Sequence, residues 1–163
     1  MKRMVLLLGF VCVFILPGQK ADACTCGSFT GKAVDANGNP VKTDLGEVKR
    51  FWLEEFKGAA FVGKVLRVEK VSVKWFDENQ RMKKVTVNVE RYWLGVNSST
   101  FVIYTNPSKG GDCGVNYVKD ERYFFYAPLI GGLLWTNSCS SSAPESDFAK
   151  FFRETLGDGK SSF

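Results

Sequence analysis

The stretch Val85-Thr86-Val87-Asn88-Val89-Glu90 decides the fold, because it alternates valine with polar residues. Strict alternation places one kind of side chain on each face of a β-strand. Residues 60–75 also repeat with a period of two, but their apolar phase changes near Glu69-Lys70. This change predicts a bulge or a sharp bend in one long strand. Residues 77–79 are expected to turn the chain between the two strands.

Three shorter strands are predicted over residues 100–105, 122–127 and 133–137. Together with the two longer ones they make five strands, the first of them long and bent. This pattern is typical of a small Greek-key barrel of the OB type. The sequence therefore predicts an all-β fold class, a five-stranded OB-fold barrel with flanking helices.

Two helices are expected beside the barrel. The first begins at Asp44, has Glu47 as its capping-box partner and ends near Gly58. The second begins with a capping box of Ser142 and Glu145 and ends at Gly157. Residues 27–43 are predicted to be irregular, and residues 158–163 to be a flexible tail.

The first 23 residues have the three parts of a secretory signal. Lys2 and Arg3 precede an apolar run over residues 4–16, and Ala21-Asp22-Ala23 forms the cleavage site. The run is shorter than the roughly 20 residues needed to cross a bilayer, so we expect no transmembrane segment. Cleavage after Ala23 predicts a secreted, extracellular protein that begins at Cys24. A lipid-anchored form, acylated on Cys24, is the alternative, although Ala21 and Asp22 fit a lipobox poorly.

The chain contains no histidine, which excludes Ser-His-Asp and Cys-His catalysis and histidine-ligated zinc. Neighbouring carboxylates such as Glu54 and Glu55 point in different directions and do not form acid–base pairs. The protein is therefore expected not to be an enzyme and to carry no cofactor of its own. The net charge of +5 is spread along the chain without a dense basic run, which argues against nucleic-acid binding.

The cysteines form an even set once the signal is removed. Cys12 lies in the signal, and four remain: Cys24, Cys26, Cys113 and Cys139. In a secreted chain four cysteines imply two disulfides. A bond between Cys24 and Cys26 would close a very small, strained ring. Both remaining pairings tie the terminal Cys-Thr-Cys to two distant loops, and the residues alone do not choose between them.

A family resemblance rests on these motifs and their order. Cys24-Thr25-Cys26 follows the signal, Cys113-Gly-Val115 follows a strand, and Cys139 ends the last strand. The set resembles the tissue inhibitors of metalloproteinases, over residues 24–26 and about 56–157. The likeness is to their N-terminal inhibitory domain, which is a netrin-like module on an OB barrel. The expected organisation is a signal over 1–23, this domain over 24–157 and the tail.

The resemblance implies disulfides Cys24–Cys113 and Cys26–Cys139. It further implies that the α-amino nitrogen and carbonyl oxygen of Cys24 chelate the catalytic zinc of a secreted or membrane-bound zinc metalloproteinase, and that Thr25 enters its specificity pocket. The implied protease-binding residues are Cys24, Thr25, Cys26, Asp112, Cys113, Gly114 and Val115. The protein is expected to act as a monomer.

Three features depart from the family pattern. Gly27-Ser28 follows Cys26 where relatives commonly carry proline, residues 27–55 form a longer insertion, and a third disulfide lacks its cysteines. The alternative function is therefore a netrin-type extracellular binding module that inhibits no protease and binds a matrix or cell-surface partner. A separate motif, Asn97-Ser-Ser99, is an N-glycosylation sequon.

Overall fold

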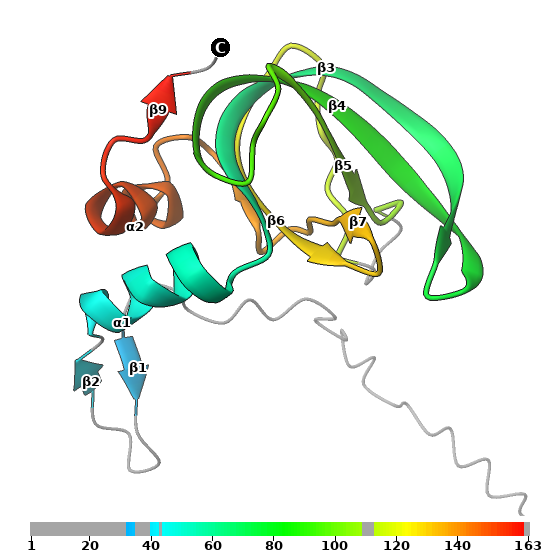
Figure 1. The fold of residues 1–163 in the computed structure, drawn as a ribbon. Coiled ribbons are helices and arrows are strands. Elements are labelled where there is room, and N and C mark those ends of the chain that lie inside the picture. The colour runs from blue at the N-terminus through cyan, green and yellow to red at the C-terminus, as the bar shows by residue number, and fades with distance from the viewer. Residues whose placement is uncertain (1–31, 35–39, 43, 109–112, 162–163) are drawn as a thin grey trace, which may run out of the picture.

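A long antiparallel hairpin, β3 (Gly58–Trp75) and β4 (Glu78–Leu94), forms the centre of the fold (Figure 1). The computed structural model describes residues 32–34, 40–42, 44–108 and 113–161. Val85, Val87 and Val89 are buried in β4, as their alternation predicts. The hairpin therefore supplies the apolar face on which the rest of the molecule is built.

The remaining strands continue this hairpin into a nearly closed barrel. They are β5 (Thr100–Thr105), β6 (Arg122–Ile130) and β7 (Leu133–Leu134), and the strand order is β5-β4-β3-β6-β7, antiparallel throughout. A parallel bridge between Tyr104 and Trp135 joins the two ends of the sheet. The Thr136 amide also donates to the Tyr104 carbonyl at 2.8 Å. This connectivity is compatible with the predicted OB-fold.

The predicted strand boundaries hold to different degrees. Strand β5 has the predicted bounds, and β6 extends three residues beyond the predicted end at Ala127. Strand β7 ends at Leu134 instead of reaching residue 137. It is short because Asn137 begins a side-chain-stabilised turn, in which its Oδ1 accepts from the Cys139 and Ser140 amides.

Three bulges bend the hairpin, and none lies at the predicted position. Leu66 is the extra residue in β3, whereas Glu90 and Trp93 are the extra residues in β4. Pairing runs without interruption through Glu69 and Lys70, so the bulge expected there is wrong in position. The apolar phase changes earlier because Leu66, 39% exposed, is left out of the pairing.

The tip of the hairpin is also displaced from the prediction. Phe76 and Asp77 connect the two strands, with φ angles of 47° and 67°. Positive φ at both central residues is the geometry of a type I′ hairpin turn. The turn therefore lies at 76–77, and residues 78 and 79 already belong to β4.

Two apolar clusters lie on opposite faces of β3. The first fills the barrel and includes Phe61, Val65 and Phe125; the second lies on the outer face and includes Val62 and Phe124. Adjacent strand residues point to opposite faces, so Phe61 and Val62 serve different clusters. Both faces of β3 are buried here because helices cover the outer one.

Those helices are α1 (Leu45–Arg50), which continues into the π-helical turn η1 (Phe51–Glu55), and α2 (Asp147–Leu156). As predicted, Asp44 caps α1: its carboxylate accepts from the Gly46 amide at 2.8 Å. Trp52 of η1 and Phe152 of α2 contact each other, with ring centroids 4.8 Å apart. The helices therefore pack against the barrel as one apolar layer, which Figure 1 shows beside β6.

The predicted capping box of α2 is wrong. Ser146 is the N-cap residue and accepts from the Ala149 amide at 3.2 Å. Ser142 instead lies in β8 (Ser141–Ser142) and pairs with Phe124 of β6. An extended residue in a strand cannot cap a helix that starts five positions later. The predicted end at Gly157 is confirmed, with a positive φ of 85°.

Short strands also lie near both ends of the part of the chain that the structure describes. Strands β1 (Lys32–Val34) and β2 (Pro40–Lys42) pair antiparallel with each other inside the segment predicted to be irregular. Strand β9 (Lys160–Ser161) pairs with Arg91 and Tyr92 of β4, where the sequence predicts a flexible tail. Across the described ranges, no helix combines the length and apolar character needed to cross a membrane.

Candidate functional site

The described part of the predicted inhibitory site consists of Cys113, Gly114 and Val115. Asp112, the Cys24-Thr25-Cys26 segment and the signal over 1–23 lie outside the described residues. Cys139, the other predicted disulfide residue of the barrel, is described. We call Cys113, Gly114, Val115 and Cys139 the cysteine platform.

The loops that carry the two platform cysteines are in contact with each other. The Ser138 amide donates a hydrogen bond of 2.9 Å to the Cys113 carbonyl, which joins the two loops next to both cysteines. Cys113 also has a positive φ of 56°, an uncommon conformation for a residue with a Cβ atom. The surrounding contacts must therefore hold its backbone in place.

A glycine lets the Cys113 loop approach the chain that follows β5. A Cβ atom on Gly114 would lie 2.3 Å from the Asn106 carbonyl oxygen and 2.5 Å from the Ser108 amide nitrogen. Both neighbours are backbone atoms, which cannot swing aside as a flexible side chain can. Only glycine therefore fits at position 114 in this arrangement.

Lys83 of β4 fixes the other side of the loop. Its side chain is buried beneath the platform, and its ammonium donates to Ser108 Oγ and Asn116 Oδ1, both at 2.7 Å. A third hydrogen bond of 3.2 Å reaches the carbonyl oxygen of Val115. Burial of an ammonium is costly without such partners. The lysine thus ties the segments on both sides of Cys113 to the barrel wall.

A buried hydroxyl network supports the Cys139 turn. Thr136 is fully buried, and its hydroxyl shares hydrogen bonds with those of Ser140, at 3.0 Å, and Ser141, at 2.7 Å. The Tyr117 hydroxyl also belongs to this network, through contacts with the hydroxyls of Thr136 and Ser141. Desolvation by burial raises the pKa of Tyr117 to about 12. The phenol is therefore neutral over the physiological range and acts as a structural hydrogen-bonding group.

A basic groove of about 460 Å³ adjoins the platform. Three cationic side chains line it: Lys70 of β3, and Arg81 and Lys83 of β4. Lys70 and Arg81 are exposed, whereas Lys83 is engaged by the loop. Any surface that covers the platform would therefore meet exposed positive charge on one side.

Lys83 is not among the site residues predicted from the sequence, although its position in the alternation of β4 indicates a buried role. Positions 83, 85, 87 and 89 share one phase of the alternation in β4, and three of them are buried valines. A lysine in the inward phase needs buried acceptors. This position could therefore have been identified as a polar anchor. Its partners could not, because they lie 25 to 33 residues further along the chain.

The other predicted site residue, Asn97, is exposed in the loop between β4 and β5. Its glycosylation stays a prediction. Among the residues with described positions, no three cysteine or acidic side chains form a metal-binding group. Compared with protein-family models, with curated proteins and with solved structures, the chain matches none of them.

Proposed function

We propose that the mature protein is a secreted inhibitor of zinc metalloproteinases of the tissue-inhibitor type. In this proposal Cys24 becomes the first residue, and its α-amino nitrogen and carbonyl oxygen chelate the catalytic zinc of the target. Thr25 enters the specificity pocket, and Asp112 and the Cys113–Val115 segment contact the enzyme beside it. The barrel is then a netrin-like OB module that acts as a monomer.

The observation that carries the proposal is the joining of the two cysteine loops. A hydrogen bond joins the Cys113 carbonyl to the residue before Cys139. Bonds from Cys113 to Cys24 and from Cys139 to Cys26 would hold the Cys-Thr-Cys segment across this platform. Residues 24 and 26 of an extended segment project to the same side, so both bonds are geometrically compatible.

The chemistry of the terminus fits the proposed target. Catalytic zinc keeps an open coordination position, which is normally filled by water. An α-amino group has an unperturbed pKa of about 7.7–8.0, so zinc can displace its proton near neutral pH. The amine and the carbonyl of one residue form a five-membered chelate ring with the metal. Disulfides that fix this residue reduce the entropy lost on binding.

The barrel connectivity supports the netrin-like assignment. Strands β3, β4 and β5 form an antiparallel meander, β6 pairs with β3, and the chain closes through the parallel Tyr104–Trp135 bridge. A five-stranded, partly open Greek-key barrel is the OB arrangement. Helix α2 covers its outer face through Phe152, which is consistent with one self-contained domain.

The test is an inhibition titration with protein whose N-terminus has been verified as Cys24. A panel of metzincin-type zinc proteases is assayed with a fluorogenic peptide, and a serine protease serves as the negative control. We expect zinc proteases alone to be inhibited. Thr25→Arg should change the ranking of the panel by about tenfold or more, because it alters the residue in the specificity pocket.

Thr100→Arg is the matched control, because Thr100 is an exposed threonine at the start of β5. This variant should inhibit as the parent does. Failure of the verified protein to inhibit any zinc protease would contradict the proposal. The netrin-type binding module would then be the remaining function, and a non-enzyme partner in a pull-down would support it.

A further inference from the structure

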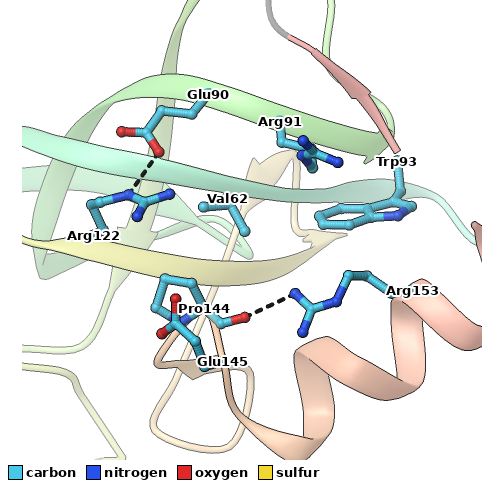
Figure 2. A pocket seen from close by; sticks show the side chains of 8 residues that line it. All are labelled: Val62, Glu90, Arg91, Trp93, Arg122, Pro144, Glu145 and Arg153. Carbon is cyan, nitrogen blue, oxygen red and sulfur yellow. Dashed lines mark hydrogen bonds and ion pairs between the residues drawn. The ribbon is translucent and has the colours of Figure 1, made fainter. Parts of the chain in front are cut away.

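A second pocket, of about 380 Å³, lies on the outer face of the barrel beside α2 (Figure 2). Its lining comes from β3, β4, β6, α2 and the segment before α2. The residues are Val62, Glu90, Arg91, Trp93, Arg122, Pro144, Glu145 and Arg153. We call this the arginine pocket. It shares no lining residue with the cysteine platform or the basic groove.

Two β-bulges build the pocket. Glu90 and Trp93, which both line it, are the two extra residues of β4. Without these bulges, strict alternation would send Glu90 and Arg91 to opposite faces of the strand. Bulges are frequent next to functional sites, where they redirect a side chain. The local departure from regular pairing is therefore what gathers charged and aromatic groups at this place.

Three guanidinium groups from three elements converge on the pocket, as Figure 2 shows. Arg122 donates from Nε to Glu90 at 2.7 Å. Arg91 donates one Nη1 bond to the Asp158 carbonyl, and Arg153 donates one to the Pro144 carbonyl. An arginine has five N–H donors, so each group is anchored by one and keeps others for a ligand.

The charge of the lining favours an anion. Carbonyl partners are neutral, and within the described ranges neither Arg91 nor Arg153 forms an ion pair. Three arginines face two carboxylates, those of Glu90 and Glu145, and Glu90 is already paired with Arg122. Guanidinium groups bind carboxylate and other oxyanions through paired, charge-assisted hydrogen bonds.

The floor and one wall of the pocket are apolar. Val62 is 5% exposed, and the Trp93 indole is held in place by a 2.7 Å hydrogen bond from Nε1 to the Gly157 carbonyl. A fixed ring costs little additional ordering when a ligand packs on it. A free inorganic ion would use the arginines but not this surface. The lining therefore matches a molecule with a charged end and a flat or short apolar body.

We propose that the arginine pocket binds a small organic carboxylate, with its carboxylate on Arg91 and Arg153 and its apolar body against Trp93 and Val62. This site is separate from the proposed protease-binding residues and does not depend on the inhibitory function. The volume lies within the range of small-molecule sites, about 300–1,000 Å³. The ligand class follows from the combination of guanidinium donors with an apolar floor.

The experiment is a titration of ¹⁵N-labelled protein followed through the Trp93 indole N–H resonance, which is assigned with Trp93→Phe. The probe is sodium benzoate at constant ionic strength, and benzamide is the uncharged control. We expect benzoate to shift this resonance saturably, with a dissociation constant on the order of 1 mM, typical of a small fragment. Benzamide and inorganic phosphate should bind at least about tenfold more weakly.

Arg153→Gln and Arg91→Gln should each weaken benzoate binding by about tenfold, because each removes charged donors. Two separate variants are used so that a folding defect in one leaves the other informative. The matched control is Arg67→Gln, since Arg67 is exposed and pairs with Glu69. The proposal is overturned if benzoate causes no saturable shift, if benzamide or phosphate binds as well, or if Arg67→Gln has the same effect as the pocket variants.

Discussion

The strongest prediction about the cysteine platform concerns Lys83. Its ammonium donates three hydrogen bonds to the segments around Cys113, to Ser108, Val115 and Asn116. Lys83→Met keeps an unbranched side chain of similar length and removes all three. The three acceptors then lose a charged donor in a buried site.

The expected cost is a balance of opposing terms. A hydrogen bond to a charged group contributes about 1.5–3 kcal/mol, whereas loss of the lysine releases its desolvation penalty and about 2 kcal/mol of ordering entropy. We therefore expect the free energy of unfolding to fall by about 2–3 kcal/mol. At about 4 °C per kcal/mol for a domain of this size, Tm should drop by about 8–12 °C.

Thermal and urea unfolding measured by circular dichroism test this expectation. Lys84→Met is the matched control: Lys84 is adjacent, only partly buried and on the other face of β4, so its loss should cost less than about 0.5 kcal/mol. Hydrogen exchange should also become faster at Val115 in Lys83→Met alone. If the two variants unfold at the same urea concentration, Lys83 does not hold the platform as described.

Three further predictions concern other parts of the fold. Gly114→Ala should destabilise the protein by more than about 2 kcal/mol in urea unfolding, because the added Cβ would overlap the Asn106 carbonyl; unchanged stability would show that the loop can move away. Ser146→Ala should lower the free energy of unfolding by about 1 kcal/mol through loss of the α2 cap, whereas Glu145→Ala should change it very little. A larger loss in Glu145→Ala than in Ser146→Ala would instead support the capping box predicted from the sequence. Burial raises the pKa of Tyr117 from 10.0 to about 12, and this shift corresponds to about 3 kcal/mol in the free energy of unfolding. That stability is complete below pH 10 and is lost as the pH rises to 12, because the phenolate is disfavoured in the folded state. In Tyr117→Phe, Tm should fall less steeply between pH 10 and 12, and parallel Tm curves would contradict the assignment.

The β-sheet core could be predicted from the sequence because it depends on a local pattern. The alternation of Val85, Val87 and Val89 predicts which face of β4 is buried, and all three side chains are buried in the barrel. The cap at Asp44 is equally local, since its carboxylate accepts from an amide two residues away. Such features need only neighbouring residues to form.

The remaining features depend on partners far along the chain. Ser142 and Ser146 are both good N-cap residues, and only the pairing of Ser142 with Phe124 decides that Ser146 caps α2. The position of the Leu66 bulge likewise depends on register with β4, which no pattern within β3 reveals. Both errors come from long-range pairing that overrides a local preference.

The candidate site divides in the same way. The cysteine spacing drew attention to Cys113 and Cys139, and the structure places their loops in contact through Ser138. The arginine pocket had no such signal, because Arg91, Arg122 and Arg153 are widely spaced and are brought together by bulges and by α2. Sites built from bulges are therefore found from structure and not from spacing.

The most direct test of the central claim compares two forms of the protein that differ by one residue before Cys24. In the proposal the native form begins at Cys24, and the extended form carries one additional alanine, which would move its amine away from the proposed chelating position. Inhibition constants are measured against the same zinc protease, with disulfide pairing verified by mass spectrometry in both forms. We predict that the native form inhibits and that the extended form does not. Equal inhibition by the two forms would contradict zinc chelation by the Cys24 terminus.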